Sequence, residues 1–193
     1  MTGDYLDRGP DSRGVLELLT SPRMRDFDPV FLAGNHDLAV ISVVQNRQCS
    51  DWLFHGGNAT MRSYGIGTDG DPNESVRAFA HQFPEHHLRF LRELRTSHVE
   101  DETLFCHAGI DPGSKSALAP QDPNVLIYGD PDFLTPHPAW KGRVVHGHWV
   151  AKEVHVSEKR IGIDTGCGFP GGKLSSIAID AVTGEVRILG ERR

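Results

Sequence analysis

Four short polar segments, three of them beginning or ending beside a glycine, constrain the fold of this chain more than any other feature of its sequence. Each follows, or is expected to follow, a strand. Because ligands of α/β proteins gather in the crevice beyond the ends of the strands, we expect the four segments to lie around one site. The segments are Gly3-Asp4-Tyr5-Leu6-Asp7-Arg8-Gly9, Gly34-Asn35-His36-Asp37, His107-Ala108-Gly109 and His146-Gly147-His148.

The rest of the pattern changes character along the chain. The first half predicts a short buried strand over 29–33 and helices over 37–45, 51–64 and 73–95, the last broken at Pro84. The second half predicts strands over 103–107, 143–146, 160–164, 174–180 and 185–189, with a hairpin turn at Thr183-Gly184. Interleaved helices and strands followed by strands alone predict an α/β fold, a two-sheet β-sandwich flanked by helices, in a single domain over 1–193.

Charge and hydropathy narrow the classes of partner. The net charge is -6 and no long basic run is present, so neither nucleic acid nor an anionic membrane is expected as a partner. No stretch approaches the roughly 20 apolar residues that cross a bilayer, and the first residues do not resemble a signal peptide. We therefore expect a cytoplasmic protein, whose oligomeric state the sequence does not indicate.

The polar segments offer a consistent set of ligand atoms. Asp4, Asn35, His107 and His148 supply oxygen and imidazole nitrogen donors without a thiolate, which suits manganese, iron or zinc at a reactive site better than a structural zinc cage. Any one of these residues alone would more often be a turn former or a hydrogen-bonded core residue. Together these four residues favour a metal site, because each of them stands in a different one of the four polar segments.

The segments resemble the motifs G-D-x-x-D-R-G, G-N-H-[DE], H-[AG]-G and G-H of the phosphoprotein (serine/threonine) phosphatases, a family of metallophosphoesterases with a calcineurin-like fold. They occur in the order of that family and span nearly the whole chain. Similarity to the bacterial members extends to Trp52-Leu53, Gly56-Gly57, Ser63-Tyr64-Gly65 and Ile163-Asp164-Thr165-Gly166.

The resemblance implies a role for each matched residue. It makes Asp4 the carboxylate that bridges two divalent metal ions (Mn²⁺, Fe or Zn²⁺), with Asn35, His107 and His148 completing the shell of the second ion. Two such ions polarise the phosphoryl oxygens and generate a hydroxide for direct in-line attack. The resemblance further makes His36 the acid that protonates the leaving oxygen, Asp7 the carboxylate that orients His36, and Arg8, together with Asn35, the groups that bind the phosphate.

Two departures from the family pattern carry expectations of their own. The family's first motif, G-D-x-H-G, does not occur before Asp4, so only one of the two metal sites is complete in this chain. We expect that the opening strand and helix of the fold are missing and that the chain is truncated at its N-terminus. Around Asp130, many relatives carry an arginine that reaches the phosphate, and Arg143 or Lys173 are candidates to replace it.

Other histidines gain nothing from the resemblance. His86 and His87 are predicted to begin a solvated helix face, and His146 is expected to flank the metal ligand His148 without being one.

Three functions remain open. The first is hydrolysis of phosphomonoesters, including phosphoserine or phosphothreonine, so that the partner is a phosphorylated protein or a small phosphoester. The second is symmetrical hydrolysis of dinucleoside polyphosphates, supported by Gly34-Asn35-His36-Asp37-Leu38, although Asp7 and the segment Ser63-Tyr64-Gly65 favour the protein phosphatases. The third is a catalytically inactive remnant that binds a metal or a partner.

Overall fold

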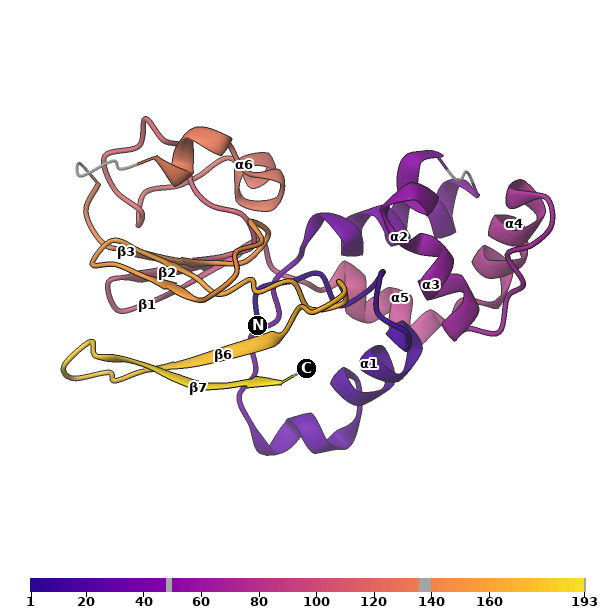
Figure 1. Ribbon diagram of the computed structural model, residues 1–193, viewed down its shortest axis with the longest axis horizontal. Coiled ribbons are helices and arrows are strands. Elements are labelled where there is room, and N and C mark those ends of the chain that lie inside the picture. Colours follow the sequence, from indigo (N-terminus) through magenta and orange to yellow (C-terminus); the bar gives the residue numbers. More distant parts are fainter. Residues whose placement is uncertain (48–49, 136–139, 193) are drawn as a thin grey trace. The chain divides into compact units, whose positions relative to one another are not determined.

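The computed structural model describes residues 1–47, 50–135 and 140–192 and divides into two compact units (Figure 1). The N-terminal unit comprises Met1 and Gly3–Leu94, and the C-terminal unit comprises Thr2 and the residues from Arg95 onward. The expectation that residues 1–193 form a single domain stays a prediction.

The N-terminal unit is helical, and polar residues at the start of its helices explain where they begin. Asp11 and Asp71 accept hydrogen bonds from the backbone of the first turns of α1 and α4, and proline at the first position of α4 suits the fixed backbone angle there. The predicted break at Pro84 is confirmed, because α4 ends before it and α5 begins after it. The helices are α1 Ser12–Leu19, α2 Asn35–Asn46, α3 Gly57–Ser63, α4 Pro72–Gln82 and α5 Glu85–Arg92, with the 3₁₀ helices η1 Pro22–Asp26 and η2 Ser50–His55.

The core of this unit joins residues from every α-helix. Phe79 is completely buried and its ring lies 5.4 Å from that of Trp52 and 5.5 Å from that of Tyr64, measured between centroids. Aromatic rings at these separations gain from edge and offset contacts in addition to the area that they bury. Around them pack the other members of the core, which include Leu16, Val40, Val43, Met61, Val76, Leu88 and Leu91.

Two expectations for this unit are corrected. The segment 29–33 is not a strand. The Val30 carbonyl accepts a hydrogen bond from the N-terminus of Met1, and the Leu32 N–H donates to the Met1 carbonyl. These two bonds form a single β-bridge at Leu32. His87 does not lie on a solvated face, because its side chain is completely buried while that of His86 is about half exposed. Successive side chains on a helix point about 100° apart, so His87 in α5 faces the core although His86 faces solvent.

The C-terminal unit contains two sheets, both in the second half of the chain as predicted. The larger has the order β1-β2-β3-β5-β4, in which β2, β3 and β5 are parallel neighbours, and β6 and β7 form a separate antiparallel hairpin. The strands are β1 Ser97–Glu100, β2 Thr103–Cys106, β3 Arg143–His146, β4 His155–Val156, β5 Arg160–Gly162, β6 Leu174–Ile179 and β7 Val186–Arg192.

Short helices cover one face of the larger sheet. Figure 1 shows α6 Pro123–Tyr128 and η3 Pro131–Leu134 on this face and the hairpin of β6 and β7 on the other. The core beneath the helices includes Leu104, Cys106, Ile110, Leu126, Phe133, Trp140 and Val144. The mixed α/β fold with two sheets and flanking helices confirms the predicted fold class.

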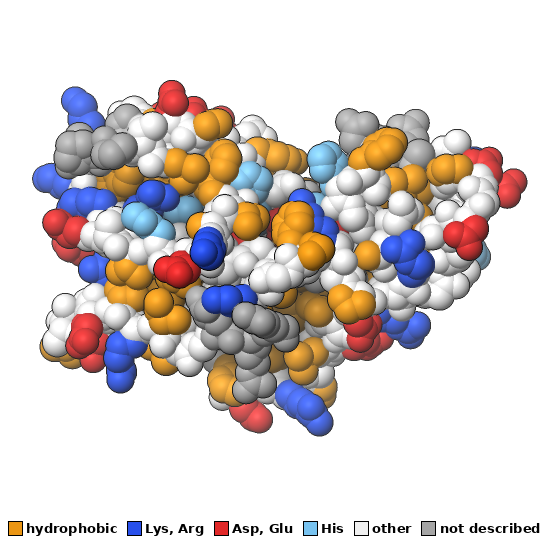
Figure 2. Space-filling model, in the orientation of Figure 1, with side chains coloured by type: hydrophobic (Ala, Val, Ile, Leu, Met, Phe, Trp, Pro, Cys, Tyr) orange, Lys and Arg blue, Asp and Glu red, His pale blue; other side chains and the backbone are white. Residues whose placement is uncertain are grey.

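The hairpin keeps apolar side chains at its surface, where Figure 2 shows hydrophobic groups at the lower left. The most exposed large hydrophobic residues of the hairpin are Leu174, Val182, Ile188 and Leu189.

Among the described residues, no helix combines the length and the apolar character that a membrane span requires.

A pair of matched substitutions measures how far the helical core stabilises the N-terminal unit. We expect Phe79→Ala to lower the free energy of unfolding by about 3–5 kcal/mol, because it removes a fully buried ring and leaves a cavity. Phe54→Ala makes the same chemical change at a side chain that is 90 % exposed, and should shift stability by less than about 0.5 kcal/mol. Chemical denaturation of both variants checks this, and similar losses would contradict the assigned core.

Candidate active site

Two predicted segments of the N-terminal unit pack backbone against backbone. Gly3 has a φ of 90°, and a Cβ added there would lie 2.5 Å from the Gly34 nitrogen. A Cβ added at Gly34 would in turn collide with the side chain and backbone of Asp4. Only glycine allows this approach, which explains why both segments begin with that residue.

Asp37 holds the two segments together from below. Its carboxylate accepts hydrogen bonds from the backbone of Asp4 (2.8 Å), Tyr5 (3.0 Å) and Gly34 (2.9 Å). The bond to Gly34 also satisfies a backbone donor before the first turn of α2. Complete burial raises the pKa of Asp37 to about 7, and the nearby charge of Asp4 adds to this effect, whereas the three backbone donors oppose it.

The predicted metal ligands Asp4 and Asn35 follow directly from this packing. Asp4 has a φ of 57°, and its Oδ1 accepts the backbone N–H of His36 at 3.0 Å, in the first turn of α2. Asn35 is the first residue of α2 and is partly buried. The positive end of a helix favours a carboxylate at this position.

His36 and Asp7 form a buried pair. His36 Nδ1 lies 2.6 Å from Asp7 Oδ2, and both side chains are almost completely inaccessible to solvent. Trp52 Nε1 donates to the same carboxylate at 2.9 Å, and Thr60 Oγ1 donates to its other oxygen at 2.6 Å. With donors on both oxygens Asp7 is held as an acceptor, so the proton of this ring lies on Nδ1 and Nε2 remains available for chemistry.

A pair of glycines positions the neighbours of this dyad. Gly56 has a φ of 109°, and a Cβ there would lie 2.7 Å from the backbone nitrogen of Arg8, which donates to the Gly56 carbonyl at 3.3 Å. A Cβ at Gly57 would collide with the ring of Trp52. Arg8 itself has a φ of 58° and an exposed side chain, as expected for a residue that binds an anion from solvent.

The C-terminal unit brings two further predicted ligands together. His107 follows β2 and His148 follows β3, and His107 Nε2 lies 3.1 Å from His148 Nδ1. His107 Nδ1 lies 2.6 Å from the carbonyl of Thr2, which can only accept, so this nitrogen carries the proton. Such a bond to the other ring nitrogen fixes the tautomer in which Nε2 carries a lone pair, as in metal-binding histidines.

His146, the other histidine of this segment, points into the protein. Its Nδ1 lies 2.9 Å from the Gly147 carbonyl, and its ring packs edge-on against Phe133. Burial lowers the pKa of His146 to about 4, and the charge of Arg160 acts in the same direction. This geometry agrees with the expectation that His148, not His146, is the ligand.

The two histidines of the C-terminal unit are spaced as ligands of a divalent metal ion would be. The separation of 3.1 Å between the two imidazole nitrogens is close to the roughly 3.3 Å between ligand atoms around a tetrahedral ion with bonds of 2.0–2.1 Å. Asp4 and Asn35 add oxygen donors in the N-terminal unit. The roles of all these residues remain predictions.

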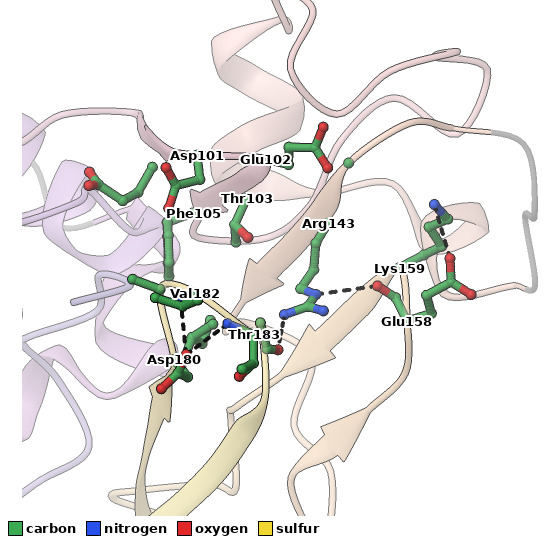
Figure 3. Close-up of a pocket in the computed structure, with 15 residues that line it drawn as sticks. Asp101, Glu102, Thr103, Phe105, Arg143, Glu158, Lys159, Asp180, Val182 and Thr183 are labelled. Atoms are coloured by element: carbon green, nitrogen blue, oxygen red, sulfur yellow. Dashed lines mark hydrogen bonds and ion pairs between the residues drawn. The ribbon is translucent and has the colours of Figure 1, made fainter.

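A cleft of about 460 Å³ in the C-terminal unit is a poor candidate for the active site (Figure 3). It lies at the start of β2 and β3, whereas His107 and His148 follow the ends of these strands, where α/β proteins place their sites. Arg143 lines the cleft and donates to the carbonyls of Gly184 (2.9 Å) and Glu158 (3.3 Å). This place, at the other end of the strands from His107 and His148, does not favour Arg143 as the replacement for a phosphate-binding arginine, and that suggestion stays a prediction.

A family match identifies the class of protein to which this chain belongs. The family model of the calcineurin-like phosphoesterases matches residues 1–156, and the chain belongs to this family. The match confirms the predicted metallophosphoesterase family, whereas the roles assigned to Asp4, His36 and the other motif residues stay predictions.

Relatives and solved structures agree with this membership. The bis(5'-nucleosyl)-tetraphosphatase PrpE [asymmetrical] of Halalkalibacterium halodurans is 25% identical over 187 residues, covering 91% of this chain and 72% of the relative. The protein of the same name from Bacillus mycoides is 27% identical over 192 residues, with the same coverage. A crystal structure of a protein proposed to be a diadenosine tetraphosphatase has a TM-score of 0.63 at 18% identity, over 99% of this chain and 78% of its own.

The supporting residues of the site were not found from the sequence. Asp37, Trp52 and Thr60 each contact a predicted site residue, yet none was assigned a role. Asp37 is the fourth residue of the G-N-H-[DE] motif and lies three residues after Gly34. A carboxylate at this position of a helix typically caps the backbone N–H of the residue that precedes the helix. No local pattern signals Thr60, whose contact spans 53 residues.

The close approach of the two glycine segments can be tested with a matched pair of variants. We expect Gly34→Ala to lower the free energy of unfolding by roughly 1–3 kcal/mol, because the added methyl group displaces Asp4. Gly70→Ala serves as the control, since nothing lies within 4 Å of its added Cβ and it should be neutral or stabilising. Thermal unfolding of the two variants decides, and an unchanged Gly34→Ala protein would contradict the packing.

Proposed function

We propose that this protein is a metal-dependent hydrolase that cleaves phosphorus–oxygen bonds, with His36 as the acid for the leaving oxygen. The observation that carries the proposal is the buried pair of His36 and Asp7, in which the 2.6 Å contact leaves Nε2 as the reactive nitrogen. Membership in the calcineurin-like phosphoesterases supports the same class of reaction.

The metal ligands proposed are Asp4 and Asn35 from the N-terminal unit and His107 and His148 from the C-terminal unit. Divalent metal ions, when bound, act as Lewis acids that polarise phosphoryl oxygens and lower the pKa of water. The tautomer of His107, fixed by Thr2, leaves a lone pair on Nε2 for this purpose. We propose Mn²⁺, Fe or Zn²⁺ as the ion.

His36 transfers a proton during bond cleavage in this proposal. Asp7 holds the proton on Nδ1 and stabilises the charged imidazolium, so Nε2–H can be donated to the oxygen that departs from phosphorus. Trp52 and Thr60 keep the carboxylate in place through both states of the ring. Arg8 and Asn35 bind the phosphoryl oxygens, and the fork of donors on Arg8 offsets the unfavourable net charge of -6.

Among the substrate classes, we favour dinucleoside polyphosphates. The two relatives described above carry the name of bis(5'-nucleosyl)-tetraphosphatases, and their names specify asymmetrical cleavage, whereas the sequence suggests the symmetrical reaction as the alternative. Phosphomonoesters, including phosphoserine and phosphothreonine, are the second candidate, because the segment around Asp7 resembles the protein phosphatases.

The role of His36 predicts a dependence on the leaving group. We expect His36→Gln to lower kcat by roughly 10²–10⁴ for phenyl phosphate, whose leaving oxygen needs a proton. The loss should be much smaller for 4-nitrophenyl phosphate, whose leaving group departs readily as an anion. Steady-state kinetics with Mn²⁺ on both substrates checks this, with His81→Gln, an exposed histidine on α4, as the control. Equal losses on the two substrates would show that His36 does not act as the acid.

The substrate class can be settled by product analysis. We expect diadenosine tetraphosphate to be hydrolysed to ATP and AMP, with a kcat/KM that exceeds those for 4-nitrophenyl phosphate and a phosphoserine peptide. Chromatography of the products separates this from symmetrical cleavage, which yields ADP alone. Faster turnover of the peptide would favour the protein-phosphatase alternative. A folded chain that hydrolyses none of the three substrates with Mn²⁺, Fe²⁺ or Zn²⁺ would be the inactive remnant.

A further inference from the structure

A buried histidine of the N-terminal unit has an unused nitrogen. His87 Nδ1 lies 2.8 Å from the Tyr64 hydroxyl, but Nε2 is buried without a hydrogen-bond partner among the described residues. Leaving such a nitrogen without a partner is costly, and native proteins rarely do so without a reason. Since the side chain is completely inaccessible, solvent does not explain it.

The unused nitrogen faces two other metal-binding groups. Glu17 Oε1 on α1 lies 3.7 Å from His87 Nε2, and Glu17 Oε2 lies 3.7 Å from Nε2 of His86. The rings of His86 and His87 are adjacent, with centroids 4.2 Å apart. One ligand atom from each of the three residues lies within 4.8 Å of the others. The two separations of 3.7 Å are slightly larger than the roughly 3.3 Å expected between ligands of a tetrahedral zinc ion, so small side-chain shifts would bring the groups to an ion.

The contact of His87 with Tyr64 also suits a metal ligand. His87 Nδ1 lies 2.8 Å from the Tyr64 hydroxyl, and the tautomer with its proton on Nδ1 presents the lone pair of Nε2, which is the arrangement typical of metal-binding histidines.

A cationic side chain, Arg13, already lies beside the carboxylate of Glu17. Arg13 Nε lies 3.7 Å from Glu17 Oε1, and its guanidinium lies over the ring of Tyr64. Both partners of this ion pair are about half exposed, and exposed pairs of this kind contribute little to stability. Arg13 can therefore turn toward solvent when an ion takes its place beside the carboxylate.

We propose that Glu17, His86 and His87 form a second metal site, which binds a zinc-like transition-metal ion and shares no residue with the proposed catalytic set. Two imidazoles and a carboxylate match the preference of Zn²⁺, and the exposed side of Glu17 and His86 leaves room for a water molecule as the fourth ligand. The ion would fasten α1 to α5. None of these residues has a role in the proposed reaction, so this inference does not depend on that function.

The site can be tested by zinc titration in a background that silences the catalytic ligands. We expect the full chain with His107→Ala and His148→Ala to bind one Zn²⁺ in competition with a chromophoric chelator. Glu17→Gln and His86→Ala, each added to this background, should weaken binding at least tenfold. Glu74→Gln and His81→Ala make the same changes at exposed positions of α4 and should leave the affinity unchanged.

A second measurement covers His87, whose replacement would also disturb the core. Side-chain NMR of the ¹⁵N-histidine-labelled chain should show zinc-dependent shifts of the ring nitrogens of both His86 and His87. Shifts of His86 alone would overturn the three-ligand site and leave a surface pair. Equal affinity in Glu17→Gln and its Glu74→Gln control would overturn the proposal as well.

Discussion

The close contact between the backbones of two loops is the constraint on which the proposed site depends. Gly3 and Gly34 lie where any side chain would collide with the opposite loop, and Asp37 accepts three backbone hydrogen bonds beneath them. This arrangement places the carboxylate of Asp4 against the start of α2 and fixes the direction of His36. Precise positioning of this kind is what metal binding and proton transfer require.

The two units support their ligands in different ways. In the N-terminal unit the polar residues lie above a core of aromatic rings, and Trp52 belongs both to that core and to the shell of Asp7. In the C-terminal unit, parallel strands bring His107 and His148 to the same end of a sheet, and the carbonyl of Thr2 orients His107. The proposed ligands His107 and His148 thus follow the ends of neighbouring strands, whereas Asp4 lies in a tightly bonded loop and Asn35 begins α2.

Much of this could be predicted from the sequence because the signals were local. The strands β2, β3, β5, β6 and β7, the break at Pro84 and the motif residues each follow from a few neighbouring residues, whereas β1 and β4 are not among the predicted strands. The failures involve partners distant in the chain. The residue pattern of 29–33 predicts a strand, but pairing with a neighbouring segment decides this and only a single bridge forms there. The helix α1 is not among the predicted elements. The burial of His87 depends on Tyr64 and Glu17, which lie on other helices.

The saturated carboxylate of Asp7 has a consequence for how sequences of this kind can diverge. His36, Trp52 and Thr60 each bond to it, and the Asp7 backbone in turn donates to Thr60 and Ser12. Loss of one donor leaves a buried charge undercompensated, so single replacements within the group are penalised even where the reaction is not under selection. These residues are thus expected to be inherited as a block and to change together, while the surface of the same helices drifts freely.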